Sequence, residues 1–218
     1  MRGRYLEGAR AIAPIGVAAF AFALSFGVLA RTAGMGWAAP LVMSATTFAG
    51  SAQLAVASFL GDGGAAAAAI AAAVMLNARY VPISISVASR FESPLSRRLL
   101  EAQLIVDESW AVALRHRSGF DVRVLLGAGA LLYLIWNAGT AVGVLLGDAV
   151  GDASRLGLDA AFPALFLALL VPQLRGRQEL TAALLGGGIA LALVPFTPAG
   201  VPIVAGAAGC LAGWWMRA

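Results

Sequence analysis

Long apolar runs, separated by short polar or glycine-rich turns, make up most of the chain. A helix needs about 20 apolar residues to cross the ~30 Å hydrocarbon core of a membrane. The apolar runs lie at 11–30, 38–60 and 65–89 in the first half and at 124–147, 158–174, 180–196 and 201–216 in the second. This pattern predicts an all-α integral membrane protein that forms one transmembrane transporter domain over 1–218. We expect about seven transmembrane helices, some of them discontinuous, with six and eight as the alternatives.

Segment 90–123 interrupts this pattern because it is polar and rich in arginine. It contains an apolar stretch at 99–114, which Asp107 and Glu108 interrupt. Such a stretch can lie on the membrane surface as an amphipathic helix, or it can cross the membrane as a further span. We prefer the amphipathic interpretation, in which this segment joins two apolar halves, 11–89 and 124–205.

The arginines indicate the orientation, because positive residues collect on the cytoplasmic side of a membrane protein. With 90–123 in the cytoplasm, the second half places its aspartates outside and Arg217 inside. Three spans in the first half would instead leave the three arginines of the first ten residues outside. Either the N-terminus is an exception, or one first-half segment is re-entrant, or 99–114 crosses. We expect a multi-pass protein of the cytoplasmic membrane with a cytoplasmic C-terminus.

The two halves carry matching residues at an offset of 116. Gly27-Val28-Leu29 corresponds to Gly143-Val144-Leu145, and Pro82 corresponds to Pro198. Chance and an internal repeat both explain such matches in so apolar a sequence. If the repeat exists, an odd number of spans per half would give it the inverted topology known from secondary transporters.

Composition fits a lipid environment and excludes several classes of protein. Hydrophobic residues make up 61% of the chain and charged residues 12%, with a mean hydropathy of +0.87, unlike a soluble domain. All 15 basic residues are arginine, which excludes a Walker A lysine and a Schiff-base lysine. The single His116 and single Cys210 are too few for a metal cluster or a disulfide framework. The arginines lie at the ends of apolar runs and form no basic face for nucleic acid. We therefore expect no enzyme activity, cofactor, metal or nucleic acid.

The first candidate site is a group of polar residues inside the apolar run at 38–60. Hydroxyls, a glycine and a carboxamide occur together there, and the group includes Phe48, Gly50, Ser51 and Gln53. A helix interrupted at Gly50-Ser51 would expose backbone N–H groups, whose partial positive charge suits a substrate carboxylate. The alternative is that these small residues only let helices pack closely. We take these four residues as candidates for substrate binding.

The second candidate site is the pair Asn77 and Arg79 in the run at 65–89. A buried arginine costs at least about 2.5–3.5 kcal/mol in a transmembrane helix, so something must compensate for it. Arg79 can clamp a substrate carboxylate through two hydrogen bonds, pair with an acid of segment 90–123, or extend to the membrane surface. Pro82 follows shortly and predicts a kink or a break in the helix.

Asp107 and Glu108 are the candidates for proton coupling. If 99–114 is buried, an acid there can carry a proton, because burial raises the pKa of a carboxyl group. If the segment lies on the membrane surface, both residues are only solvated charges.

Together these residues resemble a known family. The runs Phe48-Ala49-Gly50-Ser51-Ala52-Gln53, Asn77-Ala78-Arg79 and Asp107-Glu108-Ser109, in this order and spacing, are similar to the AzlC/YgaZ family of branched-chain amino acid permeases. The sequence departs from the family at Tyr80, where a histidine or another polar residue usually follows the arginine.

The resemblance implies a secondary transporter that exports valine, leucine, isoleucine or related compounds. It also implies a small, separately encoded membrane partner of the AzlD/YgaH type. We leave open whether the chain also forms homo-oligomers. We expect the export to be independent of ATP and coupled to protons. The alternatives are a carrier or channel for another small solute and a scaffold subunit of a membrane complex.

Overall fold

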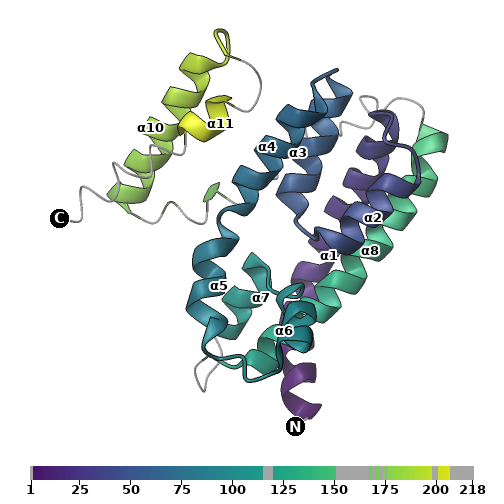
Figure 1. Ribbon diagram of the computed structural model, residues 1–218, viewed down its shortest axis with the longest axis vertical. Helices are drawn as coiled ribbons and strands as arrows, with labels where there is room; N and C mark the ends of the chain where they lie inside the picture. The colour runs from purple at the N-terminus through teal and green to yellow at the C-terminus, as the bar shows by residue number, and fades with distance from the viewer. Residues whose placement is uncertain are drawn as a thin grey trace.

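The computed structural model describes residues 2–114, 120–150, 167, 170, 171, 174, 176–197 and 201–206. The regular secondary structure of these residues is helical throughout, as the fold class predicts. The helices are α1 (Arg2–Thr32), α2 (Ala38–Thr46), α3 (Gly50–Gly61), α4 (Ala66–Asn77), α5 (Tyr80–Ala88), α6 (Leu95–Ala102), α7 (Asp107–Leu114), α8 (Val122–Val150), α10 (Arg177–Leu193) and α11 (Val201–Gly206) (Figure 1).

Three stretches of the described chain are long and apolar enough to cross a membrane. They are Gly3–Thr32, Ala66–Ala88 and Val122–Gly147. Each matches one of the expected apolar runs, and the second consists of α4 and α5 in continuation. Helix α10 covers most of the expected run at 180–196, whereas most of 158–174 and of 201–216 lies outside the described residues.

The apolar run at 38–60 does not cross the membrane. It is divided at residues 47–49 into α2 and α3, and the chain reverses direction there (Figure 1). Helix α2 begins close to the end of α1, and Gly61 at the end of α3 packs against Ala33 at that same end. The turn itself reaches the middle of α8, where the Tyr133 hydroxyl donates to the Ala45 carbonyl at 2.8 Å. The expected single crossing at 38–60 is therefore wrong, and the reversal agrees with the re-entrant alternative. Hydropathy did not reveal this because it measures the length of a run and not its direction.

The re-entrant segment resolves the conflict in the arginine pattern. Only the continuous pair α4 and α5 crosses between α1 and α8, so both of these helices begin at the same end of the molecule (Figure 1). An ion pair of 3.5 Å between Arg4 and Asp121 joins their beginnings. The N-terminal arginines thus lie at the same end as segment 90–123.

Helices α1 and α8 run side by side in the same direction and touch through glycines. Gly8 faces the backbone of Val124, and Gly27 faces Gly143. A Cβ atom added to Gly143 would lie 2.1 Å from the Leu24 carbonyl oxygen, so only glycine permits this approach. The two contacts have the offset of 116 seen in the sequence. Equivalent helices of an inverted repeat run in opposite directions, whereas α1 and α8 run in the same direction. The expected inverted topology is therefore wrong for this pair, and the repeat itself stays a prediction.

The stretch 99–114 neither crosses the membrane nor lies wholly on its surface. Its first part, in α6, exposes Leu99 and Leu100. After a turn at 103–106, α7 packs against α8 and α1. The preferred interpretation as one amphipathic surface helix is therefore wrong for α7. A hydrogen bond from Gln103 to the Thr46 carbonyl and the ion pair between Asp107 and Arg79 hold the beginning of α7 against the other helices.

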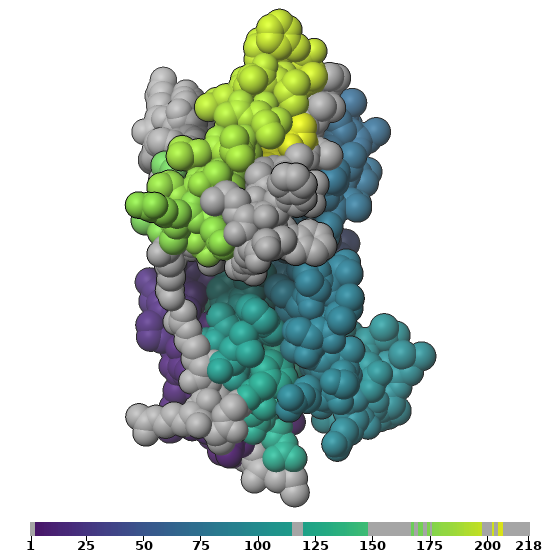
Figure 2. All heavy atoms as spheres, turned by 90° about the vertical axis from the view of Figure 1, so that its left-hand side faces the viewer, coloured from purple at the N-terminus to yellow at the C-terminus, as the bar shows by residue number. Residues whose placement is uncertain are grey.

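The C-terminal part of the described chain adds α10 and α11. These two helices pack against each other, and α11 also touches α4. Figure 2 shows α10 beside the upper part of the molecule, next to the α3–α4 region. The candidate site lies elsewhere, between the break of the re-entrant segment, the α4–α5 junction and the beginning of α7.

Candidate functional site at the meeting point of two helix breaks

The break between α2 and α3 is held in an unusual backbone conformation. Phe48 has a φ of +42°, in the left-handed region that a non-glycine residue rarely adopts. Its side chain is only 6% exposed, and its ring meets the Tyr133 ring edge-on at 5.2 Å between centroids. Strained residues of this kind persist only where the surrounding structure fixes them, and they cluster at functional sites.

Gln53 fixes this break from inside the protein. It is 0% exposed, its Oε1 accepts from the Ala49 N–H at 3.2 Å, and its Nε2 donates to Ser44 Oγ at 2.8 Å. Ser44 in turn shares a 2.8 Å hydrogen bond with Thr140 of α8. The first of these bonds supplies an acceptor for the N-terminus of α3, as the side chain of a capping box does. We call Ser44, Gln53 and Thr140 the buried triad.

The N-terminus of α3 is directed to the second break. Its first helical hydrogen bond runs from Gln53 N–H to the Ala49 carbonyl at 2.9 Å, so the amides of Gly50, Ser51 and Ala52 precede the helical ladder. Ser51 Oγ accepts a hydrogen bond from Arg79 Nη2 at 2.9 Å. The two candidate segments predicted from sequence therefore meet.

The second break lies between α4 and α5. Pro82 has no N–H to donate to the Ala78 carbonyl, which accepts instead from Val81 at 3.1 Å in a tighter turn. Ala78 and Arg79 thus connect two helical pieces, which confirms the irregularity that Pro82 predicted. The break places Arg79 well inside the stretch Ala66–Ala88.

Arg79 pairs with an acid of the protein. Its Nη2 lies 3.1 Å from Asp107 Oδ2, and the two side chains are 39% and 40% exposed. The Tyr80 ring lies 5.2 Å from the guanidinium carbon, a cation–π distance. Of the three alternatives for Arg79, the structure shows the internal pair, and the side chain does not extend to the membrane surface.

The beginning of α7 brings both candidate acids to this point. Asp107 and Glu108 form its first turn, where the helix dipole favours negative charge. Gln103, just before, donates to the Thr46 carbonyl at 2.9 Å, which ties the turn at 103–106 to the end of α2. Ser109 Oγ accepts from the Val106 N–H at 3.0 Å. Asp107 is thus placed against Arg79 and is not a solvated surface charge.

Two polar atoms near the breaks are buried and lack a hydrogen-bond partner among the described residues. They are Asn77 Oδ1, at the end of α4, and Trp136 Nε1 of α8. The Trp136 indole also covers Gly50, where an added Cβ would lie 2.6 Å from the indole Cη2. Buried polar atoms are nearly always paired in proteins, so these two unpaired atoms mark the region between the breaks as a candidate for ligand binding.

Sequence reasoning did not find several residues that shape this site. Ser44, Thr140 and Gln103 make its framework, yet Ser44 and Thr140 are 96 residues apart, and no local pattern links them. For Trp136 a signal was present, since a tryptophan beside Asn137 stands in an apolar run. Asn137 itself donates to the Tyr133 carbonyl of its own helix at 2.9 Å.

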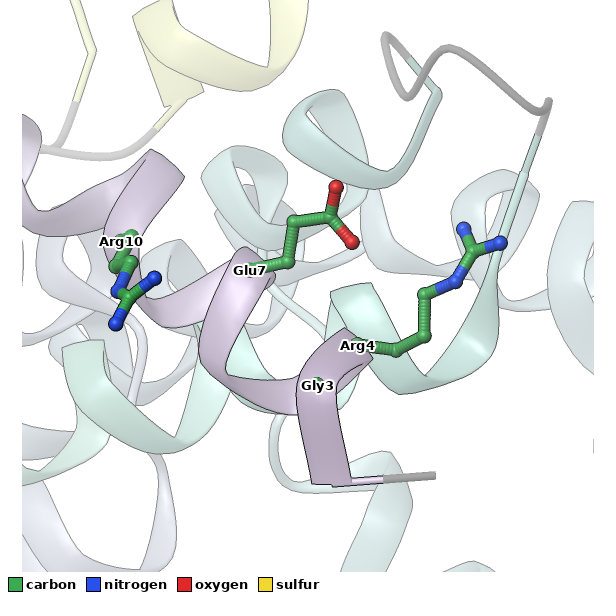
Figure 3. A pocket seen from close by; sticks show the side chains of 4 residues that line it. All are labelled: Gly3, Arg4, Glu7 and Arg10. Atoms are coloured by element: carbon green, nitrogen blue, oxygen red, sulfur yellow. The ribbon is translucent and has the colours of Figure 1, made fainter.

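A pocket of about 430 Å³ lies away from this site, at the N-terminal end of α1. Gly3, Arg4, Glu7 and Arg10 line it (Figure 3). One of these residues, Arg4, also pairs with Asp121 just before α8, and none of the four is a candidate site residue. His116 and Cys210 lie outside the described residues.

Comparison with known proteins gives two curated relatives and one family. The model of the AzlC protein family matches residues 14–150. An uncharacterized membrane protein of Archaeoglobus fulgidus is 35% identical over 92% of the chain and 90% of its own length. The branched-chain amino acid transport protein AzlC of Bacillus subtilis is 26% identical over 78% of the chain and 67% of its own length. No solved structure matches the chain significantly.

Proposed function

The chain belongs to the AzlC protein family, and from this premise we propose that it is a secondary transporter exporting branched-chain amino acids. The coarser part of this statement, a membrane transporter, rests on the family and on the Bacillus subtilis relative. The structural observation that carries the finer part is Arg79, a guanidinium deep in a transmembrane stretch that faces the N-terminus of α3.

The arrangement suits a carboxylate of a small solute. The Arg79 guanidinium can form two parallel hydrogen bonds to a carboxylate, and the first amides of α3 add partial positive charge beside it. Asn77 Oδ1 is an acceptor without a partner among the described residues and suits a hydrogen-bond donor of the solute. Beside the site lies a buried apolar cluster that includes Phe48 and Trp136, and the partly buried Tyr80 packs against it. This gives the site an apolar wall for a branched aliphatic side chain.

We assign Gln53 a different role from the other candidate residues. All of its recorded hydrogen bonds lie within the protein and it is fully buried, so it holds the break that presents Gly50 and Ser51. Asp107 and Glu108 stay the candidates for the coupled proton. The arginines gathered at one end support a cytoplasmic position for that end by the positive-inside rule, and we propose that the membrane is the cytoplasmic membrane.

The test is efflux of labelled leucine and valine from proteoliposomes with and without an imposed pH gradient, using the chain alone and with a small AzlD-like membrane subunit. Gradient-dependent efflux supports the proposal, and the two preparations tell whether the subunit is required. We expect Arg79→Ala to abolish flux, while Arg90→Ala, which removes an exposed arginine after α5, preserves it. Absence of flux in every preparation would overturn branched-chain export.

A further inference from the structure

The ion pair between Arg79 and Asp107 stands at the position where the substrate would bind. Asp107 Oδ2 lies 3.1 Å from Arg79 Nη2, and the same nitrogen donates to Ser51 Oγ. Both side chains are about two-fifths exposed, so the pair is not sealed inside the protein. Each also projects from the end of a helix beside irregular backbone, Arg79 at the α4–α5 junction and Asp107 after the turn at 103–106.

We propose that an α-amino acid zwitterion inserts into this ion pair, so that its carboxylate binds Arg79 and its ammonium group binds Asp107. This inference rests on the proposed function and adds the recognition of the second charge. Insertion replaces one ion pair by two, and no charge is left unpaired in a site where an unpaired charge is costly. A free carboxylate or a free amine satisfies only one side of the pair and leaves the other charge alone.

The same geometry couples the substrate to protons. A proton on Asp107 removes the charge that attracts the ammonium group, so the proton and the substrate exclude each other at this carboxylate. The charged and titratable groups around Asp107 are Arg79 and Tyr80 from the α4–α5 junction and Glu108 from α7 itself.

Helices α1 and α8 pack against this region with the apolar side chains of Ile12, Ala128 and Leu132. A carrier that holds either a proton or an amino acid exchanges them in opposite directions. Entry of one proton would release the substrate and allow Asp107 to return to its pair with Arg79 after deprotonation on the other side. This direction agrees with export that is driven by protons entering down their gradient.

The test measures binding of three solutes to the full-length protein in lipid nanodiscs at pH values from 5 to 8. The probes are leucine, 4-methylpentanoate, which lacks its ammonium group, and 3-methylbutylamine, which lacks its carboxylate. For the unmodified protein we expect leucine to bind more tightly than either analogue, and its binding to strengthen as the pH rises.

Asp107→Asn separates the proposal from its alternatives. We expect it to weaken leucine binding about 10- to 100-fold, as for the loss of one hydrogen bond between charged groups. The variant should leave 4-methylpentanoate binding unchanged or tighter and should remove the pH dependence. Asp107→Glu should restore part of the leucine affinity. Asp62→Asn, the same change in the exposed turn between α3 and α4, should behave like the unmodified protein.

Each other result has a definite meaning. Unchanged or tighter leucine binding by Asp107→Asn would overturn the inference and make Asp107 only an internal partner of Arg79, while leaving branched-chain transport intact. If the unmodified protein binds other α-amino acids with the same dependence on Asp107 but not leucine or valine, the inference stands and the proposed substrate fails. Binding of no zwitterion at all would overturn both.

Discussion

The two helix breaks carry polar groups at similar depth but satisfy them in opposite ways. At the break between α2 and α3, the buried triad is 0% exposed and its members bond to one another and to the backbone. At the α4–α5 junction, Arg79 and Asp107 are about 40% exposed, and Asn77 has a buried oxygen without a partner among the described residues. The buried triad at the first break is closed to a ligand, whereas the ion pair at the second break is open to one.

This difference distinguishes residues that hold the structure from residues that can bind a ligand, although both kinds look alike in the sequence. A carboxamide at Gln53 and a guanidinium at Arg79 are both unexpected in an apolar run, and both are costly to insert. What distinguishes them is whether their hydrogen bonds are completed within the protein. We therefore expect changes in the buried triad to act on stability and changes at Arg79 and Asp107 to act on transport.

The largest effect on stability is expected from Gln53→Leu. The substitution leaves the Ala49 N–H without its acceptor inside a buried region, and such an unpaired group costs roughly 1–3 kcal/mol. The free energy of unfolding of the purified protein should fall by about this amount. Ser89→Ala, which changes an exposed polar side chain after α5, is the control. If the control lowers the free energy of unfolding as much as Gln53→Leu does, the buried triad has no special role in stability.

A smaller effect is expected from Thr140→Val, which preserves the shape of the side chain and removes the bond to Ser44. Hydrogen bonds between membrane helices average about 0.6 kcal/mol, with values up to ~1.7 kcal/mol. Denaturant unfolding of Thr140→Val, Ser44→Ala and the double variant would measure the coupling, and the combined loss should be less than additive. The exposed Ser84→Ala is the control. Strict additivity would show that the triad does not act as a unit.

The smallest effect on stability is expected from Arg79→Ala, although this variant should lose flux. A half-exposed ion pair contributes less than ~1 kcal/mol, and the Asp107 carboxylate left behind can take up a proton instead of staying as an unpaired charge. Thermal unfolding should therefore change little. The measurement compares unfolding and leucine efflux on one preparation, with Arg90→Ala beside it. If Arg79→Ala lowers the unfolding temperature more than Gln53→Leu does, Arg79 has a structural role and is not mainly a residue of the binding site.

Apolar run lengths predicted the crossing helices because length and hydropathy alone determine whether a helix can span the hydrocarbon. The sequence at 38–60 also predicted an interruption, and the structure places it at residues 47–49, just before Gly50. The sequence did not favour a reversal of the chain at this break. The reversal is seen in a contact between distant residues, Gly61 against Ala33, and hydropathy does not detect such contacts. The positions of the arginines did indicate this arrangement. A re-entrant segment was one of the three explanations for the conflict between the N-terminal arginines and the positive-inside rule.

The candidate site was predictable in its charged residues and not in its framework. Arg79 and Asp107 stand out as charges within apolar surroundings, and their pairing was one of the open alternatives. The buried triad consists of common residues whose meaning depends on contacts between distant helices. A local signal was missed at Gly139, Gly143 and Gly147, whose spacing of four is typical of close helix packing in membranes and which face α1 in the structure.

The glycine contact between α1 and α8 also has a consequence for biosynthesis. Val124 follows Gly8 by 116 residues, so the ribosome delivers α1 to the membrane well before its partner exists. Until then, the glycine face of α1 lies against lipid or the insertion machinery. The break at 47–49 also waits for α8, because Ser44 bonds to Thr140. A nascent chain that ends with α7 already holds Arg79 and Asp107, and it gains the helix that aligns them only when synthesis has passed the middle of the protein.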